Sequence, residues 1–118
     1  VEFYKECRKA EVKPIIGCEV YVDPNGYSCR EGKGQYHLIL LAENNEGYRN
    51  LVKICSKGWT EGFYRKPRAD HELLKTYSSG LIALSACVAG ELPQAILERD
   101  MDKHEAAAGT ERKGIRQS

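Results

Sequence analysis

The sequence lacks the features that would assign it to several large classes of protein. Its 18 lysines and arginines nearly balance its 17 aspartates and glutamates, so overall charge gives no reason to expect nucleic-acid binding. No stretch approaches the roughly 20 apolar residues of a membrane-spanning helix, and no signal-like segment opens the chain. Internal repeats and low-complexity segments are also absent. We therefore expect a cytoplasmic protein that does not bind a membrane.

The cysteines favour neither a zinc ribbon nor a disulfide framework, because there are 5 of them and no CxxC pair occurs. Reduced thiols, as in a cytosolic protein, are expected instead. Cys7, Cys18 and Cys55 lie on apolar stripes or faces and are predicted to be core residues. Cys29 lies in a polar loop and is predicted to be exposed.

Alternating strand and helix patterns predict an α/β protein. Strands are expected over residues 14–22, 36–42 and 81–87. Only a turn signal and a polar loop separate the first two, so they should form an antiparallel hairpin rather than a βαβ crossover. Helices are predicted over residues 1–10, 46–57, 70–77 and 91–98.

Side-chain spacing adds detail to these helices. The first helix is amphipathic and should cover a sheet. Asn44 or Asn45 should cap the second helix, and Asp70 the third. The second helix should pack through a stripe formed by Tyr48, Leu51, Val52 and Cys55.

Glu19 is the exceptional residue of the first strand, which otherwise reads as buried. Alternation places Glu19 and Gly17 on one face, and the other face is wholly apolar, with Ile16, Cys18, Val20 and Val22. A carboxylate is almost never fully buried unless it is paired or binds a metal. Glu19 therefore indicates either a metal ligand or an ion pair with a lysine or arginine. Gly17 leaves room for a close approach beside it.

Six strings spread over roughly the first 100 residues carry a further signal. They are VEFYKEC (1–7), KPIIGCEVYV (13–22), YHLILLA (36–42), GYRNL (47–51), EGFYRKPRAD (61–70) and GLIALSAC (80–87). Together they resemble the polymerase and histidinol phosphatase (PHP) domain at the amino end of the bacterial replicative DNA polymerase III alpha subunit. The resemblance implies that residues 1–102 form a partial slice of a distorted TIM-like (β/α) barrel. Residues 103–118 offer little to bury and are predicted to be a disordered or non-native tail.

Relatives commonly carry glycine where Glu11 stands. Glycine suits the left-handed residue that closes a helix, so Glu11 is expected to cost up to about 1 kcal/mol there.

The resemblance also implies that Glu19, His37 and Cys87 are ligands of a divalent-metal cluster. Carboxylate, imidazole and thiolate donors suit zinc or another transition metal such as manganese. Glu19 lies late in its strand, His37 opens the next and Cys87 closes the third, so the three could meet at one rim. Without the resemblance, His37 would read as a strand-end histidine and Cys87 as a small buried residue. His71 and His104 are not expected to bind metal.

A basic loop is the second candidate site. Arg65, Lys66 and Arg68 could neutralise phosphates while Phe63 and Tyr64 stack on bases. A solvated loop, or a docking surface for neighbouring polymerase domains, is the alternative.

The function implied by the resemblance is that of part of a replicative DNA-directed DNA polymerase, with metal-dependent phosphoesterase or 3′–5′ exonuclease potential in the intact protein. DNA and the other polymerase III subunits would be its partners. The family's HxH, TDH and DxH elements are not among these residues, so the chain alone is expected to be inactive, and no catalytic residue is predicted beyond the metal ligands. Two alternatives stay open: a non-catalytic structural or subunit-docking module, and a stand-alone PHP-family phosphatase.

Overall fold

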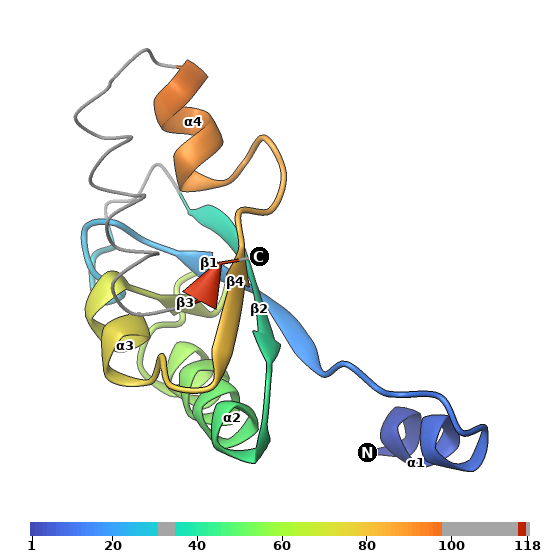
Figure 1. Ribbon diagram of the computed structural model, residues 1–118. Coiled ribbons are helices and arrows are strands. Elements are labelled where there is room, and N and C mark those ends of the chain that lie inside the picture. Colours follow the sequence, from blue (N-terminus) through green and yellow to red (C-terminus); the bar gives the residue numbers. More distant parts are fainter. Residues whose placement is uncertain (31–34, 98–115, 118) are drawn as a thin grey trace.

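A mixed sheet forms the centre of the computed structural model, which describes residues 1–30, 35–97 and 116–117. Among these residues the sheet has 5 strands in the order β3-β1-β2-β4-β5 (Figure 1). Its middle strands are β1 (Gly17–Val22), β2 (Tyr36–Ala42) and β4 (Leu81–Leu84), and two-residue strands, β3 (Arg68–Ala69) and β5 (Arg116–Gln117), pair parallel at its edges. The predicted α/β class is confirmed, and the sheet with its helices is consistent with part of a TIM-like barrel.

The predicted hairpin is also confirmed, because β1 and β2 pair antiparallel from Gly17 opposite Leu41 to Val22 opposite Tyr36. Gly17 permits this close pairing. A Cβ atom built on it would lie 2.5 Å from Cδ2 of Leu41 and 2.7 Å from the carbonyl oxygen of Leu40. The close approach expected beside Gly17 is therefore made by β2.

Four helices are described: α1 (Glu2–Lys9), α2 (Asn45–Thr60), α3 (His71–Thr76) and α4 (Glu91–Leu97). The two predicted caps are confirmed. Oδ1 of Asn44 accepts the Gly47 N–H at 2.9 Å, and Oδ1 of Asp70 accepts the Leu73 N–H at 2.8 Å. None of the helices in the described part of the chain is long and apolar enough to cross a membrane.

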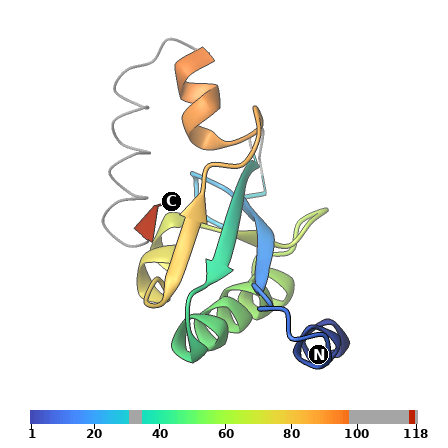
Figure 2. The ribbon, with the colours of Figure 1, turned by 45° about the vertical axis from the view of Figure 1, so that its right-hand side comes forward.

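The core lies between the sheet and the helices α2 and α3 (Figure 2). Cys18, Val20 and Val22 of β1 face this core, as the alternation predicted. Cys18 and Cys55 pack against it as partly buried residues. The buried members are Val20, Val22, Leu38, Leu40, Leu51, Ile54, Ala69, Leu73, Leu74, Leu81 and Ala83.

Two packing predictions are wrong. Helix α1 was expected to cover a sheet, but none of its residues is buried, and it stands off from the body at the end of a linker (Figure 1). Cys7, which α1 carries, is therefore not a core residue. Glu11, beyond the end of α1, has φ of 56°, which confirms the left-handed conformation expected there.

The second wrong prediction concerns the inward face of α2. Leu51 is buried as predicted, but Tyr48 and Val52 are 47% and 45% exposed, and Ile54 takes their place. Glycine contacts explain the rotation of the helix. A Cβ atom on Gly47 would overlap the carbonyl oxygen of Gly80, so this side of α2 lies against the chain just before β4.

Two further boundaries differ from the sequence-based expectation. The third strand was expected to reach Cys87, but β4 ends at Leu84 and Cys87 lies in the following loop. Most of the predicted tail, including His104, lies outside the described residues. Arg116 and Gln117 pair with β4 as β5, and the domain boundary at residue 102 stays a prediction.

Candidate metal centre and the neighbouring basic loop

Glu19 and His37 meet on the sheet face that points away from the core. The β1–β2 register places Tyr21 opposite His37 and Glu19 opposite Ile39, so Glu19 and His37 are diagonal neighbours on one face. Nδ1 of His37 lies 2.9 Å from Oε1 of Glu19, and their side chains are 27% and 48% exposed. The strand was expected to be buried, but on this face the carboxylate stays open to solvent.

Cys87 reaches the same histidine from the loop after β4. The backbone N–H of His37 donates to the carbonyl oxygen of Ala89 at 3.0 Å, and this hydrogen bond ties the loop to the start of strand β2. The Ala89 N–H in turn donates to Sγ of Cys87 at 3.4 Å. Sγ lies 3.7 Å from Nδ1 of His37, a residue 50 positions away in the chain. Loop packing, rather than the end of a strand, therefore positions Cys87.

The three predicted ligands thus gather around Nδ1 of His37. Two atoms bound to one tetrahedral zinc ion are about 3.3–3.6 Å apart, because zinc bonds to nitrogen, oxygen and sulfur are about 2.0–2.3 Å long. The separations of 2.9 Å and 3.7 Å lie on either side of this range. Within the described residues, however, no group of three or more His, Cys, Asp or Glu side chains is arranged to hold a metal ion. Glu19 and Cys87 each lie close to His37, and that the three side chains bind a metal stays a prediction.

Tyr21 packs beside this cluster and was not singled out from the sequence. Its ring meets the His37 imidazole edge to face, with the centroids 5.0 Å apart and the planes at 80°. Nζ of Lys66 lies 4.5 Å from the centroid of the Tyr21 ring. In the sequence, Tyr21 could have been found from its position two residues after Glu19, which places both side chains on the same face of the strand. Tyr21 therefore links the candidate ligands to the basic loop.

The basic loop is a tight turn that presents Arg65 and Lys66 to solvent. The Tyr64 N–H donates to the carbonyl oxygen of Lys66 at 3.0 Å, and Arg65 at the tip has φ of 62°. Phe63 stacks on Trp59, with their centroids 5.5 Å apart. Arg65 and Lys66 stay available to an anionic partner, whereas one face of Phe63 is already occupied.

Arg68 does not join them. It is 2% exposed, and its guanidinium donates to Oδ2 of Asp23 at 2.8 Å and to the carbonyl oxygen of Gly62 at 2.9 Å. It also donates to the carbonyl oxygens of Tyr27 and Cys29. The prediction that Arg68 contacts nucleic acid is corrected, because its guanidinium is buried and four of its five N–H donors are already bonded inside the fold. The buried ion pair considered for Glu19 is formed by Asp23 instead.

His71 pairs with a carboxylate in a different part of the fold. Its Nε2 lies 2.8 Å from Oε2 of Glu91, which joins α3 to α4. The hydrogen bond with Glu91 raises the pKa of His71 above its usual value, and partial burial opposes the shift. That His71 binds no metal stays a prediction.

Comparison with known proteins agrees with the resemblance seen in the sequence. The chain is similar to the DNA polymerase III subunit alpha of Chlamydia muridarum, with 53% identity over 104 residues, covering 85% of this chain and 8% of the relative. For the Thermus aquaticus subunit the identity is 48% over 111 residues, with 90% and 9% covered. For the Treponema pallidum subunit it is 46% over 111 residues, with 88% and 10% covered. The chain thus spans about a tenth of the length of these relatives. The family model described as "PHP domain" matches residues 1–117, and the chain belongs to the PHP domain family.

Proposed function

We propose that this chain is part of the PHP domain of a replicative DNA polymerase, and that Glu19, His37 and Cys87 contribute to a divalent-metal site that hydrolyses phosphodiester bonds in the intact protein. The observation that carries the proposal is that a carboxylate oxygen of Glu19 and the thiol of Cys87 both lie close to Nδ1 of His37. Oxygen, nitrogen and sulfur together suit zinc, with manganese as the alternative. A bound ion would supply a water molecule activated for attack and positive charge to stabilise the phosphate.

The chain's own residues would position the ligands and the DNA. Tyr21 holds the plane of the His37 ring, and the loop hydrogen bonds at Ala89 hold Cys87. The ammonium group of Lys66 lies over the Tyr21 ring, 4.5 Å from its centroid. A DNA strand bound by Arg65 and Lys66 would therefore run beside the candidate ligands. Together with the similarity to polymerase subunits, this arrangement is the basis for proposing a 3′–5′ exonuclease role, with DNA and other polymerase subunits as partners in the cytoplasm.

A non-catalytic docking module is the second candidate function. The absence of a complete ligand group among the described residues favours it. By the same observation, the chain alone is proposed to be inactive, because its three donors are only part of a ligand set. The similarity to polymerase subunits supports both candidates over a stand-alone phosphatase.

Metal analysis of the intact parent polymerase separates the two candidates. We expect Glu19→Gln, His37→Gln and Cys87→Ser each to lower metal affinity at least about tenfold and to reduce release of a mispaired 3′ nucleotide. Cys29→Ser and His71→Gln are the matched controls and should keep their metal. If all three ligand variants retained full metal content, the docking role would be supported instead.

The DNA-binding part of the proposal is tested by the salt dependence of affinity. Arg65→Ala and Lys66→Ala should each weaken binding of single-stranded DNA to the parent and reduce the salt slope by roughly one unit. Lys75→Ala, which removes an exposed cation from α3, is the control. Unchanged slopes in both loop variants would remove the loop from the DNA path.

A further inference from the structure

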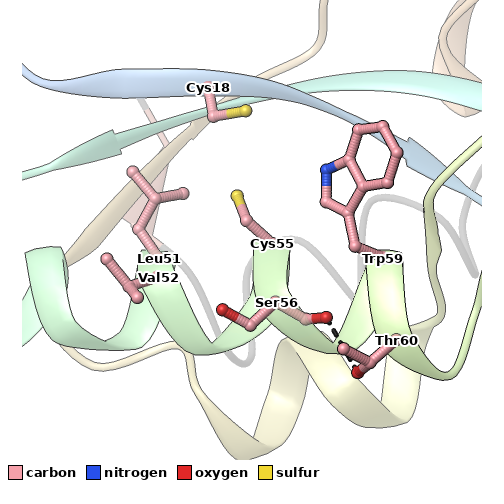
Figure 3. Close-up of a pocket in the computed structure, with 7 residues that line it drawn as sticks. All are labelled: Cys18, Leu51, Val52, Cys55, Ser56, Trp59 and Thr60. Carbon is pink, nitrogen blue, oxygen red and sulfur yellow. Dashed lines mark hydrogen bonds between the residues drawn. The ribbon is translucent and has the colours of Figure 1, made fainter.

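An apolar groove lies between α2 and β1 (Figure 3). It encloses about 450 Å³ and is lined by Cys18, Leu51, Val52, Cys55, Ser56, Trp59 and Thr60. The thiols of Cys18 and Cys55 point toward one another across its floor (Figure 3). Burial and the neighbouring Cys18 raise the pKa of Cys55 to about 12, which is consistent with an apolar floor.

Within the part of the chain that the structure describes, two residues that line this groove are exposed to solvent. Trp59 is 64% exposed and Val52 is 45% exposed. These two residues belong to a second apolar edge of α2, beside the one that packs on the core through Leu51 and Ile54. Together with the apolar floor, these two side chains form a surface on which another apolar segment could pack.

Helix α1 has the matching property. It is amphipathic but has no buried residue, and Phe3 and Tyr4 are 60% and 48% exposed. At 100° per residue, Phe3, Tyr4 and Cys7 lie on one face, while the opposite face is charged with Glu2, Lys5, Glu6 and Lys9. A helix of 8 residues is marginal in water without tertiary packing. Among residues 1–30, 35–97 and 116–117, therefore, no segment packs on the groove or on the apolar face of α1.

We propose that α1 docks into this groove within the same chain, with Phe3, Tyr4 and Cys7 facing Val52, Cys55 and Trp59. The dimensions agree. Helix α1 is about 12 Å long, and the rise along α2 from Leu51 to Trp59 is also about 12 Å. The linker of residues 10–16 joins α1 to β1 next to Cys18 and can span roughly 25 Å at most, so α1 can fold back onto the groove. The short tether favours docking in the same chain over docking in a second copy.

Docking would also support the strand that carries Glu19. Cys18 lines the groove, and Glu19 follows it on the opposite face of β1. Packing against Cys18 would hold β1 from the core side without touching Glu19. The inference does not depend on metal binding, and it would stand if the proposed function failed.

Trp59 provides the assay, because it is the 1 tryptophan of the sequence. In the full 118-residue chain, we expect Phe3→Asp to shift Trp59 emission to longer wavelength and to raise its acrylamide quenching constant at least about twofold, since a docked α1 shields the indole from water and quencher. Lys5→Ser, on the charged face of α1, is the matched control and should leave both readings unchanged. Equal emission and quenching in the unsubstituted chain and Phe3→Asp would overturn the proposal.

Cross-linking of the unsubstituted chain gives a second readout that does not depend on how a variant folds. A short bismaleimide should join Cys7 to Cys18 or Cys55 within one chain, with a yield independent of protein concentration. Chains joined only to one another, with a yield that rises with concentration, would assign the groove to a second copy and overturn docking in the same chain.

Discussion

Replacing Arg68 by methionine should be among the most destabilising single changes in this chain. Arg68 and Asp23 are 2% and 1% exposed, and the guanidinium lies 2.8 Å from the carboxylate. Removing one partner of a buried ion pair costs about 3–5 kcal/mol, because the other charge stays buried without compensation. The carbonyl oxygens of Gly62, Tyr27 and Cys29 would lose a donor as well. Since domains of this size are stable by about 5–15 kcal/mol, Arg68→Met should remove roughly a fifth of the stability or more.

Urea unfolding followed by circular dichroism measures this loss as a change in the free energy of unfolding. Arg65→Met, at the exposed tip of the same loop, is the control. Its free energy of unfolding should stay within about 0.5 kcal/mol of that of the unsubstituted chain. The double variant Arg68→Met with Asp23→Asn should be more stable than Arg68→Met alone by about 1 kcal/mol or more, because a neutral amide is cheaper to bury than a carboxylate. The side-chain Oδ1 of the asparagine introduced at position 23 can still accept the hydrogen bond from the Asn25 N–H that Asp23 accepts.

The reasoning would be refuted by either of two results. In the first, the free energy of unfolding of Arg68→Met lies within about 1 kcal/mol of that of the unsubstituted chain, which would mean that the pair is not buried in solution. Alternatively, the double variant could be no more stable than Arg68→Met, in which case the unpaired Asp23 charge is not the source of the cost.

Three further predictions concern the core, a helix cap and pH. Leu40 is 0% exposed, so Leu40→Ala should cost about 2–5 kcal/mol in urea unfolding, whereas Leu97→Ala, at an exposed position, should cost little; equal losses would contradict the assigned core. Asn44→Ala removes the cap of α2 and should cost about 1 kcal/mol, seen as a lower Tm; an unchanged Tm would count against the cap. Glu91 raises the pKa of His71, so the folded state holds this proton more tightly: the stabilisation is full below about pH 6.5 and is lost as pH rises through the folded-state pKa. His71→Gln should remove this loss of stability with rising pH, measured as the free energy of unfolding across the pH range. Identical pH profiles for His71→Gln and the unsubstituted chain would contradict the role given to His71.

Short-range features of this fold could be predicted because they depend on neighbours in the sequence. Asn44 and Asp70 cap their helices through amide groups three residues ahead. The left-handed Glu11 follows from the way a helix ends. The strand faces of β1 follow from alternation, which the backbone imposes on any extended segment.

The rotation of α2 could not be predicted in the same way. Its apolar residues occupy more than one face, so periodicity alone cannot tell which edge packs on the sheet. The close contact of Gly47 with Gly80 decides it, and it leaves Tyr48 and Val52 outside. Arg68 shows the same limit, because a run of basic residues gives no sign that one of them turns inward to Asp23.

The sequence by itself determined the kinds of donor, the hairpin and the face of β1 that carries Glu19, since backbone geometry and local turns set all three. Only the tertiary structure decided that Glu19 and Cys87 both reach Nδ1 of His37, that Tyr21 and Lys66 lie beside them, and that α1 stays off the core. These relations join residues far apart in the chain. They depend on sheet register and on loop contacts such as His37 to Ala89, which no short stretch of sequence encodes.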